Sequence, residues 1–287
     1  MGAKLGQNFL TDPNILRKII ALTAPTSTET VVEVGCGDGI LTRALLESAK
    51  QLYVVEIDET CIINTKQNLG IIDLAASSAE PSLLPIFIHG DVLEVGFRAV
   101  ETTDRPFRII ANIPYYISAK FIALCAAYKQ QITDITLMLQ WEFAKKLVSK
   151  PGESGYTPLA IFAQMHFDIR LDFQVSRNCF RPAPKVDSAI VTLRPKAVPE
   201  DLVNDDGFFL FVKAVFWGRR KPLKSALNKS PYWTVKEGYV THPIWETLGS
   251  TRAETLSREQ LLDTYRALVP YLERVLSFKR REVFDLD

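Results

Sequence analysis

Hydrophobic and polar positions along the chain alternate between short β-branched runs and longer stretches with helical spacing. Five apolar runs predict buried strands, and they lie near Thr30, Leu52, Pro85, Phe107 and Asp134. Two later runs alternate between apolar and polar residues and predict antiparallel strands at an edge, from Met165 and from Ser188. Strands that alternate with helices are typical of a doubly wound sheet, so we expect a seven-stranded, Rossmann-like α/β fold.

A change in composition after Arg194 predicts a domain boundary. The following segment contains prolines, a glycine and several charges, as linkers do, and the sequence beyond it is aromatic, basic and helical in pattern. We therefore predict a catalytic domain over residues 1–198 and a smaller helical domain over residues 199–287.

Composition narrows the possible partners. The chain has 287 residues, of which 47% are hydrophobic and 23% charged, as in globular proteins, and its net charge is only +1. A nucleic acid would therefore have to be held by local clusters of Lys and Arg. The four cysteines form no CxxC pair, so we expect no metal site and no disulfide framework. Without a signal-peptide pattern, a membrane span or heptads, we expect a cytoplasmic monomer.

A glycine-rich loop follows the first predicted strand. Gly35, Gly37 and Gly39 precede a helical stretch, as in nucleotide-binding crossovers. Ile40 stands where a dinucleotide fingerprint has its third glycine, which favours S-adenosylmethionine over NAD. A tight turn without any ligand is the alternative, because short glycine motifs also occur by chance.

Acidic residues follow the next two predicted strands. Glu56 and Asp58 end the second strand, where a carboxylate can accept from both ribose hydroxyls, and of the two we choose Glu56. Asp91 ends the third strand, where it can accept from an adenine amino group. Each acid alone is consistent with a helix cap, but their placement after consecutive strands predicts a crevice for adenosine.

The fourth predicted strand ends in Asn112, Ile113, Pro114 and Tyr115. The N6 amine of adenine is a weak nucleophile because its lone pair is delocalised into the ring. The Asn112 side-chain oxygen and the Ile113 carbonyl would each accept one N6 hydrogen, which aims the lone pair at a methyl donor. Pro114 restricts the backbone, and Tyr115 offers a face on which the base can stack. In isolation these residues would be a turn, but at this place they predict methyl transfer to adenine N6.

An ordered series of motifs over nearly the whole chain resembles the ribosomal RNA adenine dimethyltransferase family. The motifs are LGQNFL from Leu5, VVEVGCGDGILT from Val31, VVEID from Val54, GDVL from Gly90, NIPYYIS from Asn112, MLQ from Met138 and FRPAPKVDS from Phe180. The resemblance implies a class I S-adenosylmethionine-dependent enzyme. It would dimethylate N6 of two adjacent adenines near the 3′ end of 16S rRNA, within an immature small ribosomal subunit.

The resemblance also implies roles for single residues. Gln7, Asn8 and Leu10 would form an N-terminal flap over the methyl donor. Phe180 would stack on the target adenine opposite Tyr115, and Lys185 would contact the RNA backbone. The donor would be held by further residues along the strand ends, namely Gly35, Gly37, Glu56, Ile57, Asp91, Val92 and Asn112.

Three positions depart from the family pattern. Tyr116 stands where small-subunit enzymes usually have Asn, Trp141 replaces a common Lys, and Thr157–Pro158 replaces a usual Gly. We expect Tyr116 to be a packing residue. The departures leave the donor site intact and bear on how the substrate is positioned.

A basic segment between Lys213 and Lys229 contains no acidic residue, and it includes Phe216 and Trp217. Cations beside aromatic rings suit RNA, although a solvated helix face is the alternative. The family has an RRK element near this place, and we expect RNA contacts from Arg219, Arg220, Lys221 and Lys224. A second cluster, Lys279, Arg280 and Arg281, is offset by acidic neighbours and is interpreted as a solvated tail.

Other functions stay open at this point. One is the macrolide-resistance type of enzyme, which methylates an adenine of large-subunit RNA and shares the catalytic residues. Another is a ribosome-assembly factor whose methylation is secondary or lost, and a third is a small-molecule or DNA amino-methyltransferase. The helical second domain and the FRPAPKVDS motif favour the small subunit, and the intact Asn112 and Tyr115 argue against loss of activity.

Overall fold

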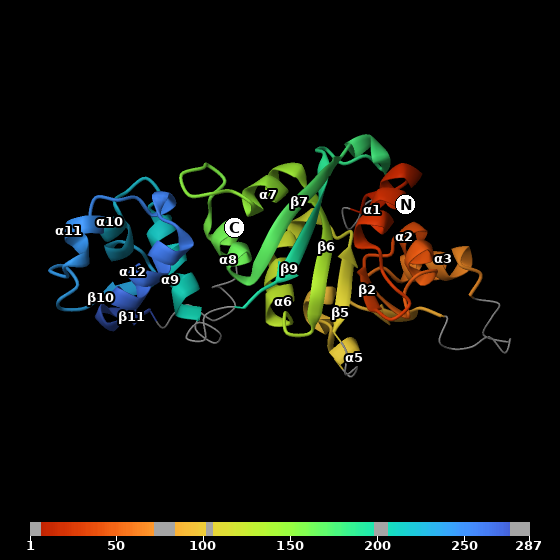
Figure 1. The fold of residues 1–287 in the computed structure, drawn as a ribbon, viewed down its shortest axis with the longest axis horizontal. Helices are drawn as coiled ribbons and strands as arrows, with labels where there is room; N and C mark the ends of the chain where they lie inside the picture. The colour runs from red at the N-terminus through yellow and green to blue at the C-terminus, as the bar shows by residue number, and fades with distance from the viewer. Residues whose placement is uncertain (1–6, 72–83, 102–105, 198–205, 276–287) are drawn as a thin grey trace. The chain divides into compact units, whose positions relative to one another are not determined.

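The computed structural model describes residues 7–71, 84–101, 106–197 and 206–275 (Figure 1). Contacts divide the chain into two compact units, of which the first is Met1–Ala144 with Phe167–Pro195 and the second is Lys145–His166 with Lys196–Asp287. The predicted domain boundary near Val198 lies outside the described residues. Residues 145–166, which we had placed in the first domain, group with the second unit.

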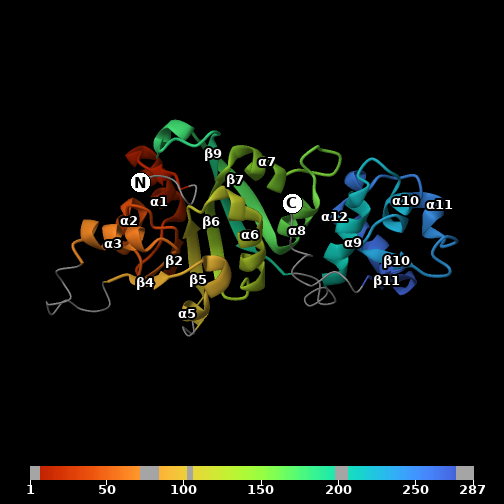
Figure 2. The same ribbon diagram turned by 180° about the vertical axis from the view of Figure 1, so that it is seen from behind.

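The first unit is built on a mixed seven-stranded sheet, which confirms the predicted fold class. The strand order is β4-β3-β2-β5-β6-β9-β7, with β4 at one edge (Figure 2). The strands are β2 (Thr30–Val34), β3 (Gln51–Glu56), β4 (Ile86–His89), β5 (Phe107–Ala111), β6 (Ile132–Gln140), β7 (Phe167–Val175) and β9 (Ser188–Pro195). Central β2 pairs in parallel with both β3 and β5, so the strand order reverses there. Ligands of such sheets bind at the carboxyl ends of the strands, at this switch point.

Strand β9 differs from the expectation that both closing strands lie at an edge. It runs between β6 and β7, antiparallel to both (Figure 1). Its first six residues are buried, and of the two closing strands only β7 lies at an edge of the sheet. The polar residues that suggested a solvent-facing side have partners inside the protein: the Ser188 hydroxyl lies 2.6 Å from the Tyr115 hydroxyl, and the Thr192 hydroxyl donates to Asp172 at 2.7 Å.

Helices cover both faces of the sheet. They are α1 (Pro13–Thr23), α2 (Ile40–Leu46), α3 (Glu59–Asn68), α4 (Val92–Val95), α5 (Arg98–Glu101) and α6 (Ser118–Ala127). On one face, Ile19 of α1 and Leu45 of α2 pack in a cluster with strand residues such as Ile110. On the other face, Phe97 packs against Phe107 of β5, with ring centroids 5.5 Å apart. Alternating strand residues point to opposite faces, so each strand contributes to both layers of the core.

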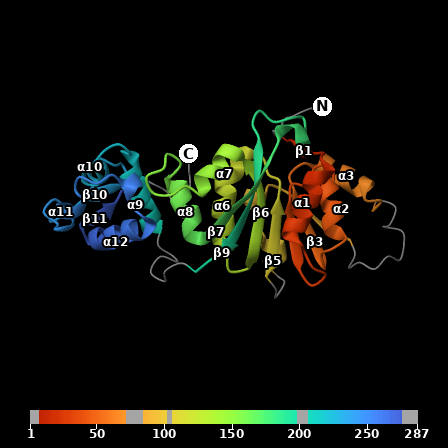
Figure 3. The same ribbon diagram turned by 45° about the horizontal axis from the view of Figure 1, so that its top comes forward.

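The N-terminal segment is tied to a distant part of the chain. The short strand β1 (Phe9–Leu10) pairs antiparallel with β8 (Phe180–Arg181), which follows the 3₁₀ helix η4 (Arg177–Cys179) (Figure 3). Directly after β1, the Thr11 N–H donates to the Cys179 carbonyl at 2.8 Å. The expected N-terminal flap is therefore a paired strand.

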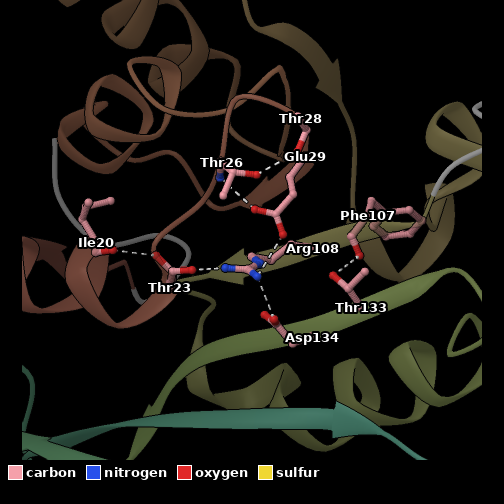
Figure 4. A network of polar contacts seen from close by, with 9 residues as sticks. All are labelled: Ile20, Thr23, Thr26, Thr28, Glu29, Phe107, Arg108, Thr133 and Asp134. Atoms are coloured by element: carbon pink, nitrogen blue, oxygen red, sulfur yellow. Dashed lines mark hydrogen bonds and ion pairs between the residues drawn. The ribbon is translucent and has the colours of Figure 1, made fainter.

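An ion-pair network joins the end of α1 to the first residues of β5 and β6 (Figure 4). Arg108, near the start of β5, pairs with Glu29 and with Asp134, each at 3.0 Å, and its guanidinium also donates to the Thr23 carbonyl. Only 14% of the Arg108 side chain is exposed. The network connects the end of α1 with β5 and β6, at the opposite end of the strands from their carboxyl ends.

The second unit is mainly helical. Its elements are the later residues of α7 (Trp141–Leu147), then α8 (Pro158–His166), α9 (Asp206–Trp217), α10 (Leu223–Asn228), β10 (Trp233–Val235), α11 (Ile244–Leu248), η6 (Ala253–Thr255), α12 (Arg258–Leu268), η7 (Val269–Tyr271) and β11 (Leu272–Arg274). Largely buried α9 packs on α8 through Phe209 and Phe162, with centroids 4.9 Å apart. The Thr157 hydroxyl accepts from the Ala160 N–H at 3.3 Å, so Thr157–Pro158 forms the start of α8. No helix in the described parts of either unit is long and apolar enough to span a bilayer.

Candidate active site

A cavity opens at the carboxyl ends of the parallel strands. Its walls come from the ends of β2, β3 and β5, the turn after β4, and the N-terminal segment. Of the residues predicted to hold the donor, all but Leu10 line it: Gln7, Asn8, Gly35, Gly37, Glu56, Ile57, Asp91, Val92 and Asn112. Asn112, Pro114 and Tyr115 line it as well.

Two glycines of the loop after β2 allow other segments to approach closely. Gly35 has φ +84°, and a Cβ there would lie 2.6 Å from the Asn112 carbonyl oxygen. Gly37 has φ +54°, and a Cβ there would lie 2.7 Å from a ring carbon of Phe9. Both positions need glycine for its conformation and for its lack of a side chain. The loop thus brings the end of β5 and the N-terminal segment to one cavity.

Glu56, the last residue of β3, holds the glycine loop while facing the cavity. Its side chain is 5% exposed, and its carboxylate accepts from the Cys36 N–H and from the Asp58 N–H, each at 3.0 Å. The Cys36 thiol also donates to it, at 3.6 Å. A carboxylate has about four acceptor sites, so these three bonds leave capacity for a ligand. Asp58 instead caps α3, accepting from the Thr60 N–H at 2.9 Å, and does not line the cavity. The geometry therefore favours Glu56 over Asp58.

Asp91 and two apolar neighbours complete the donor side. Asp91 accepts from the Leu93 N–H at 2.9 Å as the N-cap of α4, and it lines the cavity. Ile57 is 42% exposed and lines the same space as Val92. Two carboxylates that accept hydroxyl and amino hydrogens, beside exposed aliphatic surface, fit the adenosine part of S-adenosylmethionine. Among the described residues, no group of His, Cys, Asp or Glu is arranged to hold a metal ion.

Asn112 and Tyr115 are both held in place. The Asn112 N–H donates to the Val34 carbonyl at 3.1 Å, and its side-chain amide donates to the Asn8 carbonyl at 3.5 Å. The Tyr115 hydroxyl is 2.6 Å from the Ser188 hydroxyl. Burial raises the pKa of Tyr115, so its hydroxyl stays neutral. The motif therefore presents an amide oxygen and an aromatic ring to the cavity.

Two predicted residues, Leu10 and Phe180, do not line this cavity. Phe180 is 0% exposed and does not line the cavity, because it packs in a core cluster that includes Leu10. Leu10 pairs with Phe180 across β1 and β8, so it anchors the flap. Stacking of Phe180 on a base stays a prediction, and it would require this strand pair to open.

Sequence reasoning misjudged Tyr116 and missed Ser188. Tyr116 is 72% exposed at the cavity, because the 3₁₀ helix η3 (Tyr115–Ile117) turns its side chain outward, so the packing assignment was wrong. Ser188 is fully buried, and its only sequence signal was a polar residue at the start of an apolar strand.

The basic cluster of the second unit divides into bonded and exposed cations. Arg219 pairs with Glu254 at 2.5 Å, and it also donates to the Ser154 carbonyl at 2.9 Å. The Lys224 ammonium donates to the Val240 carbonyl at 2.7 Å. The exposed members are Arg220, Lys221 and Lys229, beside Trp217, which is 61% exposed; in the first unit, Lys185 is also exposed. The second predicted cluster, Lys279, Arg280 and Arg281, lies outside the described residues.

The strand order, the glycine loop after the first strand, and the acidic residues after the next two define a class I S-adenosylmethionine-dependent methyltransferase fold. The family described as "Ribosomal RNA adenine dimethylase" matches residues 2–269, and the chain belongs to this family.

Individual relatives agree with this assignment. The chain is 36% identical over 262 residues to "Ribosomal RNA small subunit methyltransferase A" of Chlorobium chlorochromatii, covering 91% of each chain. It is 34% identical to the protein of the same name from Enterococcus faecalis, covering 92% of this chain and 89% of that one. Among solved structures, it resembles a dimethyladenosine transferase from Plasmodium falciparum, with a TM-score of 0.74, 26% identity, and coverage of 91% and 98%. It also resembles the 23S rRNA methyltransferase ErmE, with a TM-score of 0.64, 26% identity, and coverage of 91% and 100%.

Proposed function

We propose that this protein transfers methyl groups from S-adenosylmethionine to N6 of two adjacent adenines near the 3′ end of 16S rRNA. It would act as a monomer in the cytoplasm, on an immature small ribosomal subunit. The observation that carries the proposal is that Asn112 and Tyr115 line the same cavity as Glu56 and Asp91. Residues suited to an adenine amine and residues suited to an adenosine-containing donor therefore lie together. The similarity to small-subunit rRNA methyltransferases supports the small subunit as the target.

Several residues would hold the donor. Bound S-adenosylmethionine supplies an electrophilic methyl group on a sulfonium. Glu56 would accept from the ribose hydroxyls and Asp91 from the adenine amino group, while Ile57 and Val92 offer apolar contact. Gln7 and Asn8 would close the cavity, and Gly35 and Gly37 would leave its floor open.

The chain's own residues orient the amine. The Asn112 oxygen and the Ile113 carbonyl each accept one N6 hydrogen, which draws the nitrogen lone pair out of conjugation with the ring. Because the Asn112 amide nitrogen already donates to Asn8, the oxygen is the group left to accept. Stacking on Tyr115 contributes about 1–3 kcal/mol and offsets much of the cost of unstacking the base. After transfer, the amine releases its proton to solvent.

We propose that RNA is contacted by the exposed cations Lys185, Arg220 and Lys221. Arg219 and Lys224 are already bonded within their unit, so we assign them to its stability instead. Exchanging Arg220 and Lys221 for Ala should reduce the slope of log affinity against log salt by about one per residue. An Arg219→Ala variant should instead lower the stability of the second unit. An unchanged slope in the double variant would remove the two residues from the RNA contact.

The function is tested by transfer of labelled methyl groups to undermethylated small subunits, with large subunits and naked RNA alongside. Dimethyladenosine confined to the small subunit is the expected product. Asn112→Ala should abolish turnover and leave donor binding largely intact, because Asn112 acts mainly on the amine. Asn178→Ala, which removes an exposed Asn outside the cavity, is the control and should be fully active. Turnover by Asn112→Ala would exclude the assigned role.

A second candidate is methylation of large-subunit RNA, which the similarity to ErmE over 91% of the chain favours. The same assay separates the two candidates. Label in large-subunit RNA alone would replace the first proposal with this one, and tight binding to small subunits without label would indicate an assembly factor.

A further inference from the structure

The hydroxyl of Tyr115 makes a hydrogen bond at the far end of the ring that faces the cavity. Its partner is the Ser188 hydroxyl, at 2.6 Å. The first side-chain torsion of a tyrosine has several staggered wells, so the backbone alone does not set where the far end of the ring lies. Pro114 restricts the backbone on one side of Tyr115, and Ser188 holds the opposite end of its side chain. The ring is thus held at two points.

Ser188 stands on a fixed backbone. It is fully buried at the start of β9, where it lies opposite Gln140 of β6 and Val175 of β7. The peptide before it is also held, because the Trp141 N–H donates to the Asp187 carbonyl at 2.9 Å. A hydroxyl on such a backbone has little freedom to move, so its bond fixes the position of whatever it contacts.

The adjacent carboxylate strengthens this support. The Asp187 side chain accepts from the Gln174 amide at 2.8 Å and from the Arg177 N–H at 2.9 Å. These bonds connect the end of β7 and the start of η4 to the residue directly before Ser188. The anchor of the Tyr115 hydroxyl therefore belongs to the sheet itself, whereas Tyr115 lies in a short 3₁₀ helix beyond the end of β5.

We propose that Ser188 is a positioning residue, which holds the far end of the Tyr115 ring and so fixes where the ring lies when its face is presented to the target adenine. The inference rests on the proposed function in one respect, namely that a base stacks on Tyr115. Ser188 touches neither donor nor base, since it does not line the cavity, and it acts only through Tyr115. Loss of either hydroxyl should then have the same consequence, and loss of both should add nothing.

The test is a double-mutant cycle with Ser188→Ala, Tyr115→Phe and the combined variant, assayed on undermethylated small subunits. We expect each single variant to lower kcat by about tenfold, with KM and the donor dissociation constant unchanged, because a misplaced ring impairs orientation rather than binding. The combined variant should be no slower than either single one. A combined loss equal to the product of the two single losses would overturn the proposal, as would full activity of Ser188→Ala.

Thr192→Val is the matched control. It removes another side-chain hydrogen bond of β9, the one to Asp172, without contact with Tyr115, so it should leave kcat unchanged. Ser188→Thr, which keeps a hydroxyl, should retain more activity than Ser188→Ala. If Ser188→Ala failed to fold, Tyr115→Phe would test the same hydrogen bond, because it removes the tyrosine hydroxyl instead of the serine hydroxyl.

A readout independent of activity separates this inference from the proposed function. NMR spectra of protein with labelled tyrosine should show changed Tyr115 ring signals in Ser188→Ala and unchanged signals in Thr192→Val. Unchanged ring signals in Ser188→Ala would refute ring positioning whatever the substrate. An inactive wild type with the expected spectral change would refute the proposed function and leave the anchor in place.

Discussion

Replacing Gly35 with Ala tests whether the donor loop and the catalytic motif depend on one close backbone contact. Gly35 has φ +84°, and a Cβ there would lie 2.6 Å from the Asn112 carbonyl oxygen, against ordinary contacts of 3.4–4 Å. The left-handed backbone costs an L-residue about 1–2 kcal/mol. Relieving the overlap moves the loop or the end of β5, and such overpacking costs about 1–3 kcal/mol more. We therefore expect a total loss of about 2–5 kcal/mol in the free energy of unfolding.

Gly70→Ala is the matched control, because Gly70 has φ +71° and open space where a Cβ would go. It carries the backbone cost alone, so the difference between the two variants isolates the contact with Asn112. Urea unfolding measures stability, calorimetry with S-adenosylmethionine measures donor affinity, and single-turnover methyl transfer measures the chemical step. Since a misplacement of about 1 Å can cost about 100-fold in rate, Gly35→Ala should lose both affinity and rate, and Gly70→Ala neither. Equal behaviour of the two variants in all three assays would refute the reasoning.

Two further predictions concern stability. Arg108→Ala should lower the free energy of unfolding by about 3 kcal/mol, because it leaves Glu29 and Asp134 without their shared cation. Urea unfolding measures this, and a changed donor dissociation constant would contradict the placement of the network away from the site. Burial raises the pKa of Glu33 to about 8, so its neutral form contributes stability that is complete below its usual value of 4.5 and is lost as pH rises through 8. The midpoint temperature of thermal unfolding should therefore fall less for Glu33→Gln than for wild type between about pH 5.5 and about pH 8.5. Parallel plots of midpoint temperature against pH for the two proteins would exclude this contribution.

Local sequence signals were enough to predict the sheet and the donor side of the site. Apolar runs that alternate with helices indicated the strands, and the position of a residue at a strand end placed Glu56 and Asp91 at one edge. Their geometry depends on their own strand and on the turn that follows it. The sequence predicts these features correctly because they depend on neighbouring residues and little on distant ones.

Features that depend on distant partners were not predictable. The burial of Phe180 follows from its pairing with Leu10, which is 170 residues away in the sequence. The pairing of Arg219 with Glu254 withdraws a cation that sequence alone would assign to RNA. The exposure of Tyr116 depends on a single 3₁₀ turn, for which an apolar pattern carries no signal.

The wrong prediction that β9 lies at an edge and the positioning role of Ser188 have the same physical cause. Polar residues in a strand predict a solvent-facing side because burying a hydroxyl without a partner costs free energy. In β9 the hydroxyls of Ser188 and Thr192 are buried and have side-chain partners, in η3 and in β7 respectively, so the alternation does not report exposure. A buried polar residue of this kind marks a required tertiary contact, and for Ser188 that contact is the hydroxyl of the motif tyrosine. The position at which the edge-strand prediction fails is thus the position from which the catalytic motif is held.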